Sequence, residues 1–417
     1  MNYLENSDKK IKSLIDLEKS RQDNTLMLIP SENYVSRAVE AAVGSSLSNK
    51  YSEGYPNKRY YQGQEFVDQV ETLAQDRAKE LFNVPHANVQ PYSGSPANAA
   101  VYFNLLNPGD TIMGLKLNSG GHLTHGHPNI TLSGKFYKSV QYEVNSKGLI
   151  DYKQLEKLAQ ETKPAIIVAG TTAYPRTLNF RKFASIANSV NAYLLADISH
   201  IAGLVVAGTH TSPATHAHII TTTTHKTLRG PRGAIIMVTN KGLKKDSELT
   251  KKIDRAVFPG LQGGPHINTI AGIAVTLKEA SKAKFKKYGH QIVKNAKALA
   301  QTLMDNQIHI VTNGTDNHLM VADLTPLNLK GKAGAILLEK AGIVTNYNTI
   351  PHDPNPPFNP SGIRLGTPAV TSRGMKEPQM RYVGKLIADV LKGDIKIDQA
   401  KKEVTDLCKK FPIPEKY

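Results

Sequence analysis

The chain has 417 residues and a mass of 45.6 kDa, which is too long for one simple core and suits two or three domains. Hydrophobic residues make up 40% and charged residues 21%, which excludes a largely disordered chain, and no apolar run approaches the roughly 18 to 20 residues of a membrane-spanning helix. With 52 Lys plus Arg against 35 Asp plus Glu, the net charge of +17 favours anionic partners such as nucleic acid, acidic membranes, or phosphate and carboxylate substrates.

The N-terminal third is predicted to be largely helical. Residues 1–23 form a polar helix suited to packing against a partner subunit, and its apolar stripe consists of Leu14, Ile15 and Leu17. Apolar residues recur at helical spacing over residues 65–82, which predicts a second helix. A third helix is predicted to begin at Pro96, because proline needs no N–H in the first turn, and to end before Asn107.

The middle of the chain alternates between strands and helices. Short apolar runs bounded by turn residues predict strands at 165–170, 192–197, 217–222 and 234–238, with a helix at 181–190. This alternation predicts a largely parallel sheet covered on both faces. Past residue 270 a helix-rich stretch leads to candidate strands at 308–311 and 319–324. The expected division is an N-terminal arm of residues 1–25, a large domain of 26–280 and a small α+β domain of 281–417.

Three segments carry residues suited to chemistry. Ser93-Gly94-Ser95, directly ahead of a helix, offers hydroxyls and free N–H groups for a phosphate, although a simple helix cap is the plainer interpretation. Asp197 closes a predicted buried strand, where it either pairs with a cation in a ligand crevice or caps the next turn. Lys226 follows four threonines and precedes Gly230-Pro231-Arg232-Gly233, a setting in which a partly desolvated lysine forms a Schiff base with an aldehyde.

A phosphate cup, a carboxylate for a pyridinium nitrogen and a Schiff-base lysine are the parts needed to hold pyridoxal phosphate. The sequence here resembles the serine hydroxymethyltransferase family, over about residues 28–374. The matching blocks are Tyr51 to Pro56, Gly120 to Gly126, Asp197 to Gly203, Thr221 to Gly233, Phe258 to Pro265, Thr315 to His318 and Ser361 to Arg364. The resemblance implies a fold-type I transferase, with a mostly parallel seven-stranded sheet in a large domain and a smaller C-terminal α+β domain.

The resemblance also implies roles for residues around the cofactor. Lys226 would carry the cofactor imine, Asp197 would pair with the pyridinium, and His122 would stack on the ring. The other residues expected at the cofactor are Ser93, Gly94, Ser95, Thr172, His200 and Tyr51, with Gly264 contributed by a neighbouring subunit. Thr223, near the imine, and His225 are expected to be catalytic. Ser199 and Thr172 differ from the residues usual in the family, as do His127 and Pro356.

For the substrates, the resemblance implies that Arg364 clamps the amino-acid carboxylate, with Ser31 nearby. Glu53 would transfer protons at the substrate hydroxyl, assisted by Tyr61, from the other subunit of a homodimer or tetramer. The residues expected at tetrahydrofolate are Leu117, Gly121, His122, Leu123, Asn348, Pro356, Pro357 and Phe358. The implied reaction, part of one-carbon metabolism and amino-acid biosynthesis, converts serine and tetrahydrofolate to glycine and 5,10-methylenetetrahydrofolate.

Several alternatives stay open at this point. A folate-independent aldolase acting on β-hydroxy amino acids would use the same lysine and carboxylate, and the positive charge suits a nucleic-acid-binding protein. The histidines at 122, 125 and 127, and those at 210, 216 and 218, lack metal-site spacing. We expect no metal, with the first cluster in a loop that stacks on the cofactor and the second in a surface turn. The single Cys408 and the lack of a secretory signal pattern predict a cytoplasmic protein.

Overall fold

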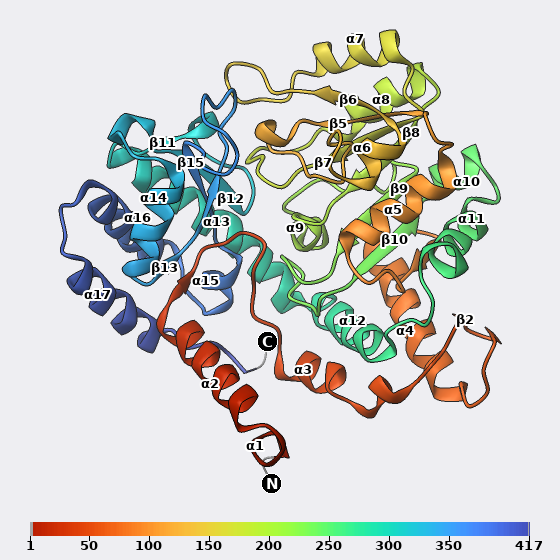
Figure 1. The fold of residues 1–417 in the computed structure, drawn as a ribbon, viewed down its shortest axis with the longest axis horizontal. Coiled ribbons are helices and arrows are strands. Elements are labelled where there is room, and N and C mark those ends of the chain that lie inside the picture. The colour runs from red at the N-terminus through yellow and green to blue at the C-terminus, as the bar shows by residue number, and fades with distance from the viewer. Residues whose placement is uncertain (1–2, 416) are drawn as a thin grey trace.

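The computed structural model describes residues 3–415 and residue 417, and its largest element is a seven-stranded sheet (Figure 1). The strand order is β4-β10-β9-β8-β7-β5-β6, in which β10 is antiparallel to both of its neighbours and the other strands run parallel to one another. The strands are β4 (His86–Asn88), β5 (Thr111–Leu115), β6 (Lys138–Tyr142), β7 (Ile166–Gly170), β8 (Tyr193–Asp197), β9 (Ile219–Thr223) and β10 (Ala234–Val238). The predicted α/β class and mostly parallel sheet are confirmed.

Helices cover both faces of this sheet because its central strands are apolar on both sides. Ile166 and Val168 of β7 pack in one core with α5 and α11, whereas Ile167 and Ala169 point to the opposite core. That second core includes helices α4, α7, α8, α9 and α12. The helices are α4 (Glu65–Phe82), α5 (Gly94–Leu105), α7 (Tyr152–Thr162), α8 (Phe180–Ser189), α9 (Ala202–Ala207), α11 (Leu249–Arg255) and α12 (Ile267–Ala280).

A third core lies around a four-stranded antiparallel sheet of order β11-β12-β15-β14. Its strands are β11 (His309–Ile310), β12 (Leu319–Asp323), β14 (Asn346–Asn348) and β15 (Gly362–Gly366). The helices of this part are α13 (Ala283–Asp305), α14 (Gly331–Lys340), α15 (Pro368–Ser372), α16 (Glu377–Lys392) and α17 (Ile397–Lys410). The short strand β1 (Leu26–Met27) pairs with β13 (Ile343–Val344), so the chain just after the N-terminal helices packs with this C-terminal part.

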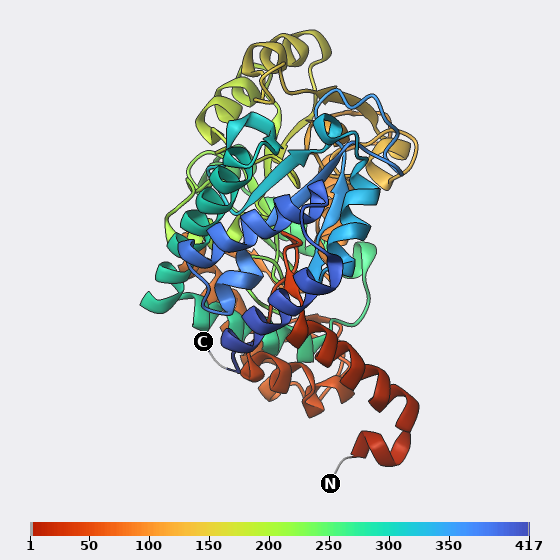
Figure 2. The ribbon, with the colours of Figure 1, turned by 90° about the vertical axis from the view of Figure 1, so that its left-hand side faces the viewer.

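The predicted N-terminal helix is present but divided. Helix α1 (Tyr3–Ser7) ends just before Asp8. The Asp8 side chain caps α2 (Lys9–Asn24) by accepting the N–H of Ile11 at 3.0 Å. Both helices project away from the body of the molecule (Figure 2). Leu14, Ile15 and Leu17 are 52%, 51% and 63% exposed, so within this chain the apolar stripe stays largely uncovered. Met1 and Asn2 lie outside the described residues.

The remaining α-helices and strands connect these parts. They are α3 (Arg37–Val43), the hairpin strands β2 (Gly54–Tyr55) and β3 (Lys58–Arg59), α6 (Leu132–Phe136) and α10 (Asn240–Lys245). The predicted helix at 65–82 is confirmed residue for residue by α4, whereas the helix predicted from Pro96 begins two residues earlier, at Gly94. No helix in the described part of the chain is long and apolar enough to cross a membrane.

Candidate active site

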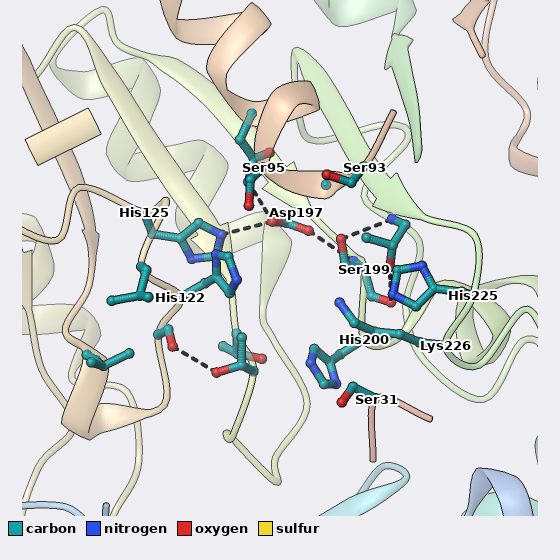
Figure 3. A pocket seen from close by; sticks show the side chains of 18 of the residues that line it. Ser31, Ser93, Ser95, His122, His125, Asp197, Ser199, His200, His225 and Lys226 are labelled. Carbon is teal, nitrogen blue, oxygen red and sulfur yellow. Dashed lines mark hydrogen bonds and ion pairs between the residues drawn. The ribbon is translucent and has the colours of Figure 1, made fainter. Parts of the chain in front are cut away.

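A cavity of about 480 Å³ opens at the carboxyl ends of β7, β8 and β9, the edge where α/β sheets bind ligands (Figure 3). The strands end in Gly170, Asp197 and Thr223, so the residues that follow each strand meet at this edge. The predicted residues that line the cavity are Ser31, Ser93, Gly94, Ser95, Leu117, Gly121, His122, Leu123, Thr172, Asp197, His200, Thr223, His225, Lys226 and Arg364. Most of the predicted cofactor residues are therefore brought together.

The first turn of α5 forms one end of the cavity. Ser93 is the N-cap residue, and its hydroxyl makes no capping hydrogen bond to the helix, so it is free for a ligand. The N–H groups of Gly94 and Ser95 have no intrahelical partner, as in the first turn of any helix, and the helix dipole adds positive potential. A Cβ at Gly94 would lie 2.7 Å from the Thr223 methyl, so only glycine lets this turn sit against β9.

Asp197 also lines the cavity and accepts three hydrogen bonds. Its Oδ2 accepts from His125 Nε2 and from Asn98 Nδ2, both at 2.9 Å, and its Oδ1 accepts the N–H of Ser199 at 3.0 Å. Burial alone raises the pKa of this carboxyl, but the hydrogen bond and charge of His125, with the other donors, outweigh it and hold the pKa well below its usual range. The carboxylate therefore stays ionised and faces the cavity.

Lys226 lies in the turn after β9 and is partly buried. Burial, opposed by the nearby Asp197 and assisted by Arg364, lowers the pKa of the Lys226 ammonium to about 8. The turn is attached to the segment that follows β8, because Thr227 Oγ1 donates to the carbonyl of His200 at 3.1 Å and accepts the N–H of Gly203 at 2.9 Å. A lysine that is partly neutral near physiological pH and held in place is suited to attack an aldehyde.

Arg364 brings a second positive charge into the cavity from β15 of the C-terminal part. Its Nη1 donates to the carbonyl of Thr172 at 2.7 Å, and its Nε donates to Asn346 Oδ1 at 3.1 Å. Burial lowers the pKa of this guanidinium to about 10, so it remains charged at neutral pH. The Thr172 hydroxyl donates to the carbonyl of Gly121 at 2.8 Å, so Thr172 contacts both Arg364 and the loop that carries His122.

Two histidines that line the cavity, His122 and His225, are held neutral. Burial, with the neighbouring charge of His125, lowers the pKa of His122 to about 4, and burial beside Lys226 lowers that of His225 to about 3. His122 Nδ1 lies 2.8 Å from the Thr124 hydroxyl, which fixes the ring at the cavity wall (Figure 3). Neutral rings can stack on an aromatic ligand without repelling Lys226 or Arg364.

A second predicted group gathers away from this cavity. Glu53 accepts from the hydroxyls of Tyr51 at 3.4 Å and Tyr61 at 3.2 Å, and the two tyrosine rings meet edge to face at 5.2 Å. Gly264 lies against the Tyr51 ring, where a Cβ would be 3.2 Å from the nearest ring atom. None of these four residues lines the cavity of its own chain, and the two tyrosines are 57% and 41% exposed.

The predicted folate residues also divide into two sets. Leu117, Gly121 and Leu123 line the cavity, and Leu123 is 38% exposed at its mouth. Asn348 and the segment 356–358 do not line it, and Phe358 is 74% exposed.

Sequence reasoning missed two residues that fix the centre of the site. Asn98 lies one turn into α5 and joins Asp197 to the Thr221 hydroxyl, which donates to Asn98 Oδ1 at 2.7 Å. His125 was expected only as part of a loop that stacks on the cofactor, yet it donates directly to Asp197 Oδ2 at 2.9 Å. A polar residue one turn after the Ser-Gly-Ser segment on an otherwise apolar helix was the available signal for Asn98.

The second histidine cluster is not the surface turn that we expected. His210 and His218 are only 6% and 3% exposed, and each fixes a buried backbone. His210 Nε2 accepts the N–H of Leu178 at 3.2 Å, and His218 Nδ1 accepts the N–H of Leu194 at 2.8 Å. These hydrogen bonds, with burial that lowers both pKa values, explain why the residues are histidines. Within residues 3–415 and 417, no group of three or more His, Cys, Asp or Glu side chains is placed to hold a metal ion.

The donor set fits pyridoxal phosphate. Open N–H groups and hydroxyls at the start of α5 suit a phosphate, the ionised Asp197 suits a protonated ring nitrogen, and the low-pKa Lys226 suits an aldehyde. His125 supports this fit, because its hydrogen bond to Asp197 holds the carboxylate in place at the cavity. All three features belong to one cavity.

Comparisons with known proteins all lead to the same family. A family model described as serine hydroxymethyltransferase matches residues 4–387. A serine hydroxymethyltransferase of Desulfotalea psychrophila is 52% identical over 417 residues, covering 99% of this chain and 96% of the relative. That of Acidothermus cellulolyticus is 54% identical over 418 residues, with 98% and 96% covered. A probable serine hydroxymethyltransferase of Mesomycoplasma hyopneumoniae (strain 7448) is 52% identical over 415 residues, with 98% of each covered.

Proposed function

The chain belongs to the serine hydroxymethyltransferase family and is a pyridoxal-phosphate-dependent one-carbon transferase, and from that premise we propose which of its residues carry the reaction. Its substrates are serine or glycine and a tetrahydrofolate. The observation that carries the assignment of residues is the meeting of Lys226, Asp197 and the start of α5 in one cavity. Bound there, the cofactor supplies an aldehyde for the amino group and an electron-withdrawing ring for the carbon that changes bonds.

Lys226 holds the cofactor and also moves protons. Its amine is partly neutral near pH 8, so it would hold the cofactor through the aldehyde and, when free, would accept a proton. Arg364 binds the substrate carboxylate, since its planar guanidinium presents paired N–H donors that lysine lacks. Thr172 and Asn346 hold Arg364 from two sides, so its orientation is set before the substrate enters.

We propose that two copies of the chain complete each site. Glu53, Tyr51, Tyr61 and Gly264 form a polar and aromatic group outside the cavity of their own chain, and the two tyrosines are partly exposed. The uncovered apolar stripe of α2 is a further surface that a second copy can bury. In this arrangement the partner's Glu53 reaches the hydroxymethyl group of serine and moves the proton of its hydroxyl.

Glu53→Gln tests this role. The amide keeps hydrogen bonds to the tyrosines but accepts no proton, so we expect folate-dependent conversion of serine to fall by roughly 10²- to 10⁴-fold, the usual share of general acid–base catalysis. Cofactor affinity should stay within about twofold. Rates with serine and tetrahydrofolate and with allo-threonine alone, measured on one preparation, make the comparison. Glu156→Gln, an exposed change on α7, is the control. Equal losses in both reactions would contradict the assigned role.

The lowered pKa of Lys226 predicts how the cofactor-free protein takes up pyridoxal phosphate. Only the neutral amine attacks an aldehyde, so the rate of imine formation should rise with pH and level off above about 8, the pKa of Lys226. Below that midpoint the rate should fall about tenfold per pH unit, as expected for one titrating group. Stopped-flow absorbance between pH 6 and 10 measures the profile. A midpoint near 10.5, the ordinary lysine value, would contradict the burial argument.

The visible spectrum of the purified enzyme tests the whole proposal. We expect an absorption band of bound pyridoxal phosphate that shifts strongly to the red on adding glycine only when tetrahydrofolate is also present. A band that ignores folate would indicate an aldolase, and no band after adding cofactor would refute the assigned site. A cytoplasmic location stays a prediction that rests on the sequence.

A further inference from the structure

Two buried histidines from different parts of the chain meet behind the cavity. His200 follows β8 of the large sheet, and His318 immediately precedes β12 of the small sheet. His200 Nδ1 lies 3.2 Å from His318 Nε2, and the rings are stacked with centroids 5.5 Å apart and planes at 30°. The two side chains are 3% and 0% exposed. No role in the proposed reaction has been given to His318.

Both rings are neutral, so the contact between them holds one proton. Burial, reinforced by Lys226 and Arg364, lowers the pKa of His200 well below its ordinary value. Burial, with the same two cations, lowers the pKa of His318 to about 3. A neutral imidazole has one N–H and one bare nitrogen. The proton in the contact therefore fixes the tautomers of both rings together.

Two arrangements of that proton are possible, and they differ in what they leave buried. If His200 donates, the remaining proton of His318 is on Nδ1, which has no hydrogen-bond partner among the described residues. If His318 donates, its Nδ1 is a bare nitrogen instead. A buried N–H without a partner is rarer and costlier than an unpaired acceptor.

We propose that His318 is a positioning residue: it donates from Nε2 to His200 Nδ1 and so keeps His200 in the tautomer that carries its proton on Nε2. His200 lines the cavity beside Lys226 (Figure 3), and its Nε2 has no partner among the described residues. His200 is thereby a fixed hydrogen-bond donor to an oxygen acceptor bound in the cavity. A phenolic oxygen such as the cofactor's ring hydroxylate is an acceptor of this class, and that last step rests on the proposed function.

Nitrogen-15 NMR of the cofactor-free enzyme, labelled at histidine, tests the tautomer directly. Comparison with His200→Gln and His318→Gln assigns the signals. We expect both His200 and His318 to show a protonated Nε2 and a bare Nδ1 between pH 6.5 and 8. A protonated Nδ1 on His200 would overturn the proposal. This measurement needs neither bound cofactor nor activity, so it stands or falls separately from the proposed function.

Variants of His318 then test the positioning role. His318→Leu removes the donor, and we expect His200 to become a mixture of tautomers, whereas His318→Gln keeps an N–H donor and should restore the Nε2 tautomer. The matched control is His210→Gln, which replaces another buried neutral histidine outside the cavity and should leave the His200 signals unchanged. An unaltered His200 tautomer in His318→Leu would refute the positioning role of His318. If His318→Leu does not fold, the spectra of the wild type and of His318→Gln still show which nitrogen of His200 carries the proton.

Ligand binding gives a second readout. We expect the wild-type apoenzyme to prefer pyridoxal phosphate over its 3-deoxy analogue, which lacks the ring hydroxyl, and His318→Leu to reduce that preference by about twofold, because an equal mixture leaves only half of the molecules in the donor tautomer. His318→Gln and His210→Gln should retain the preference. An unchanged preference in His318→Leu would show that His200 does not act through the ring hydroxyl. Failure of the wild type to bind either compound would contradict the proposed function and leave the NMR result standing.

Discussion

Lys226→Ala should lose multiple turnovers almost completely, with a fall in the rate of serine–glycine conversion of roughly 10⁴-fold or more. The change removes the one lysine among the described residues that line the cavity, together with the group that we assign to proton transfer. Steady-state assays with serine and tetrahydrofolate measure the loss. Pyridoxal phosphate should still bind, because the start of α5 and Asp197 are untouched.

A matched control separates this effect from the loss of any lysine. Lys241 on α10 is also partly buried, and burial lowers its pKa, but it lies outside the cavity. Lys241→Ala should retain activity within about twofold, as expected for a substitution away from the site. Borohydride reduction followed by peptide mapping should attach the cofactor to the peptide containing Lys226 in both the wild type and this control. Attachment to another lysine, or wild-type turnover in Lys226→Ala, would refute the assignment.

Asp197→Asn should have the second largest effect, a loss of roughly 10²- to 10³-fold in turnover, comparable to removal of one preorganised electrostatic partner. The carboxylate is an acceptor at both oxygens, with His125 and Asn98 donating to Oδ2 and the Ser199 N–H donating to Oδ1. An asparagine places its NH₂ against one of these donor sets whichever way it is oriented. The negative charge that favours a protonated ring nitrogen is lost as well.

The measurement has two parts. Titration of the apoenzyme with pyridoxal phosphate should show weaker binding, and turnover at saturating cofactor should show the remaining loss. Asp246→Asn serves as the control, because that carboxylate also accepts a side-chain hydrogen bond, from Lys252 at 2.6 Å, far from the cavity. Full turnover at saturating cofactor in Asp197→Asn would show that the charge matters only for binding.

The elements predicted most accurately were those with a strong local pattern. The helix over residues 65–82 was exact because its apolar spacing, its first-turn acids and the left-handed Asn83 that ends it are all local. Helix α5 begins earlier than expected because Ser93 takes the N-cap position, so that Gly94 and Ser95 belong to the helix whose open N–H groups face the ligand. The break at Asp8 was missed because the helical pattern continues through it.

The site was predictable where one segment carries the chemistry, and not where distant segments meet. Lys226 and Asp197 each follow a buried strand, so position along the chain was enough to identify them. The contact of His125 with Asp197 spans 72 residues and that of His200 with His318 spans 118, and neither spacing leaves a local pattern. Likewise His210 and His218 are spaced like turn residues, but their backbone partners are supplied by the folded sheet region.

The glycines around the cavity set limits on redesign of its substrate range. A Cβ would lie 1.9 Å from the Leu115 carbonyl at Gly121, 2.5 Å from the Thr227 carbonyl at Gly203, and 2.7 Å from the Thr223 methyl at Gly94. The first two of these contacts are with backbone, which cannot move aside. A mutant library intended to admit bulkier amino acids should therefore keep these positions fixed and place its diversity at Ser31 and Leu123, whose side chains line the same space.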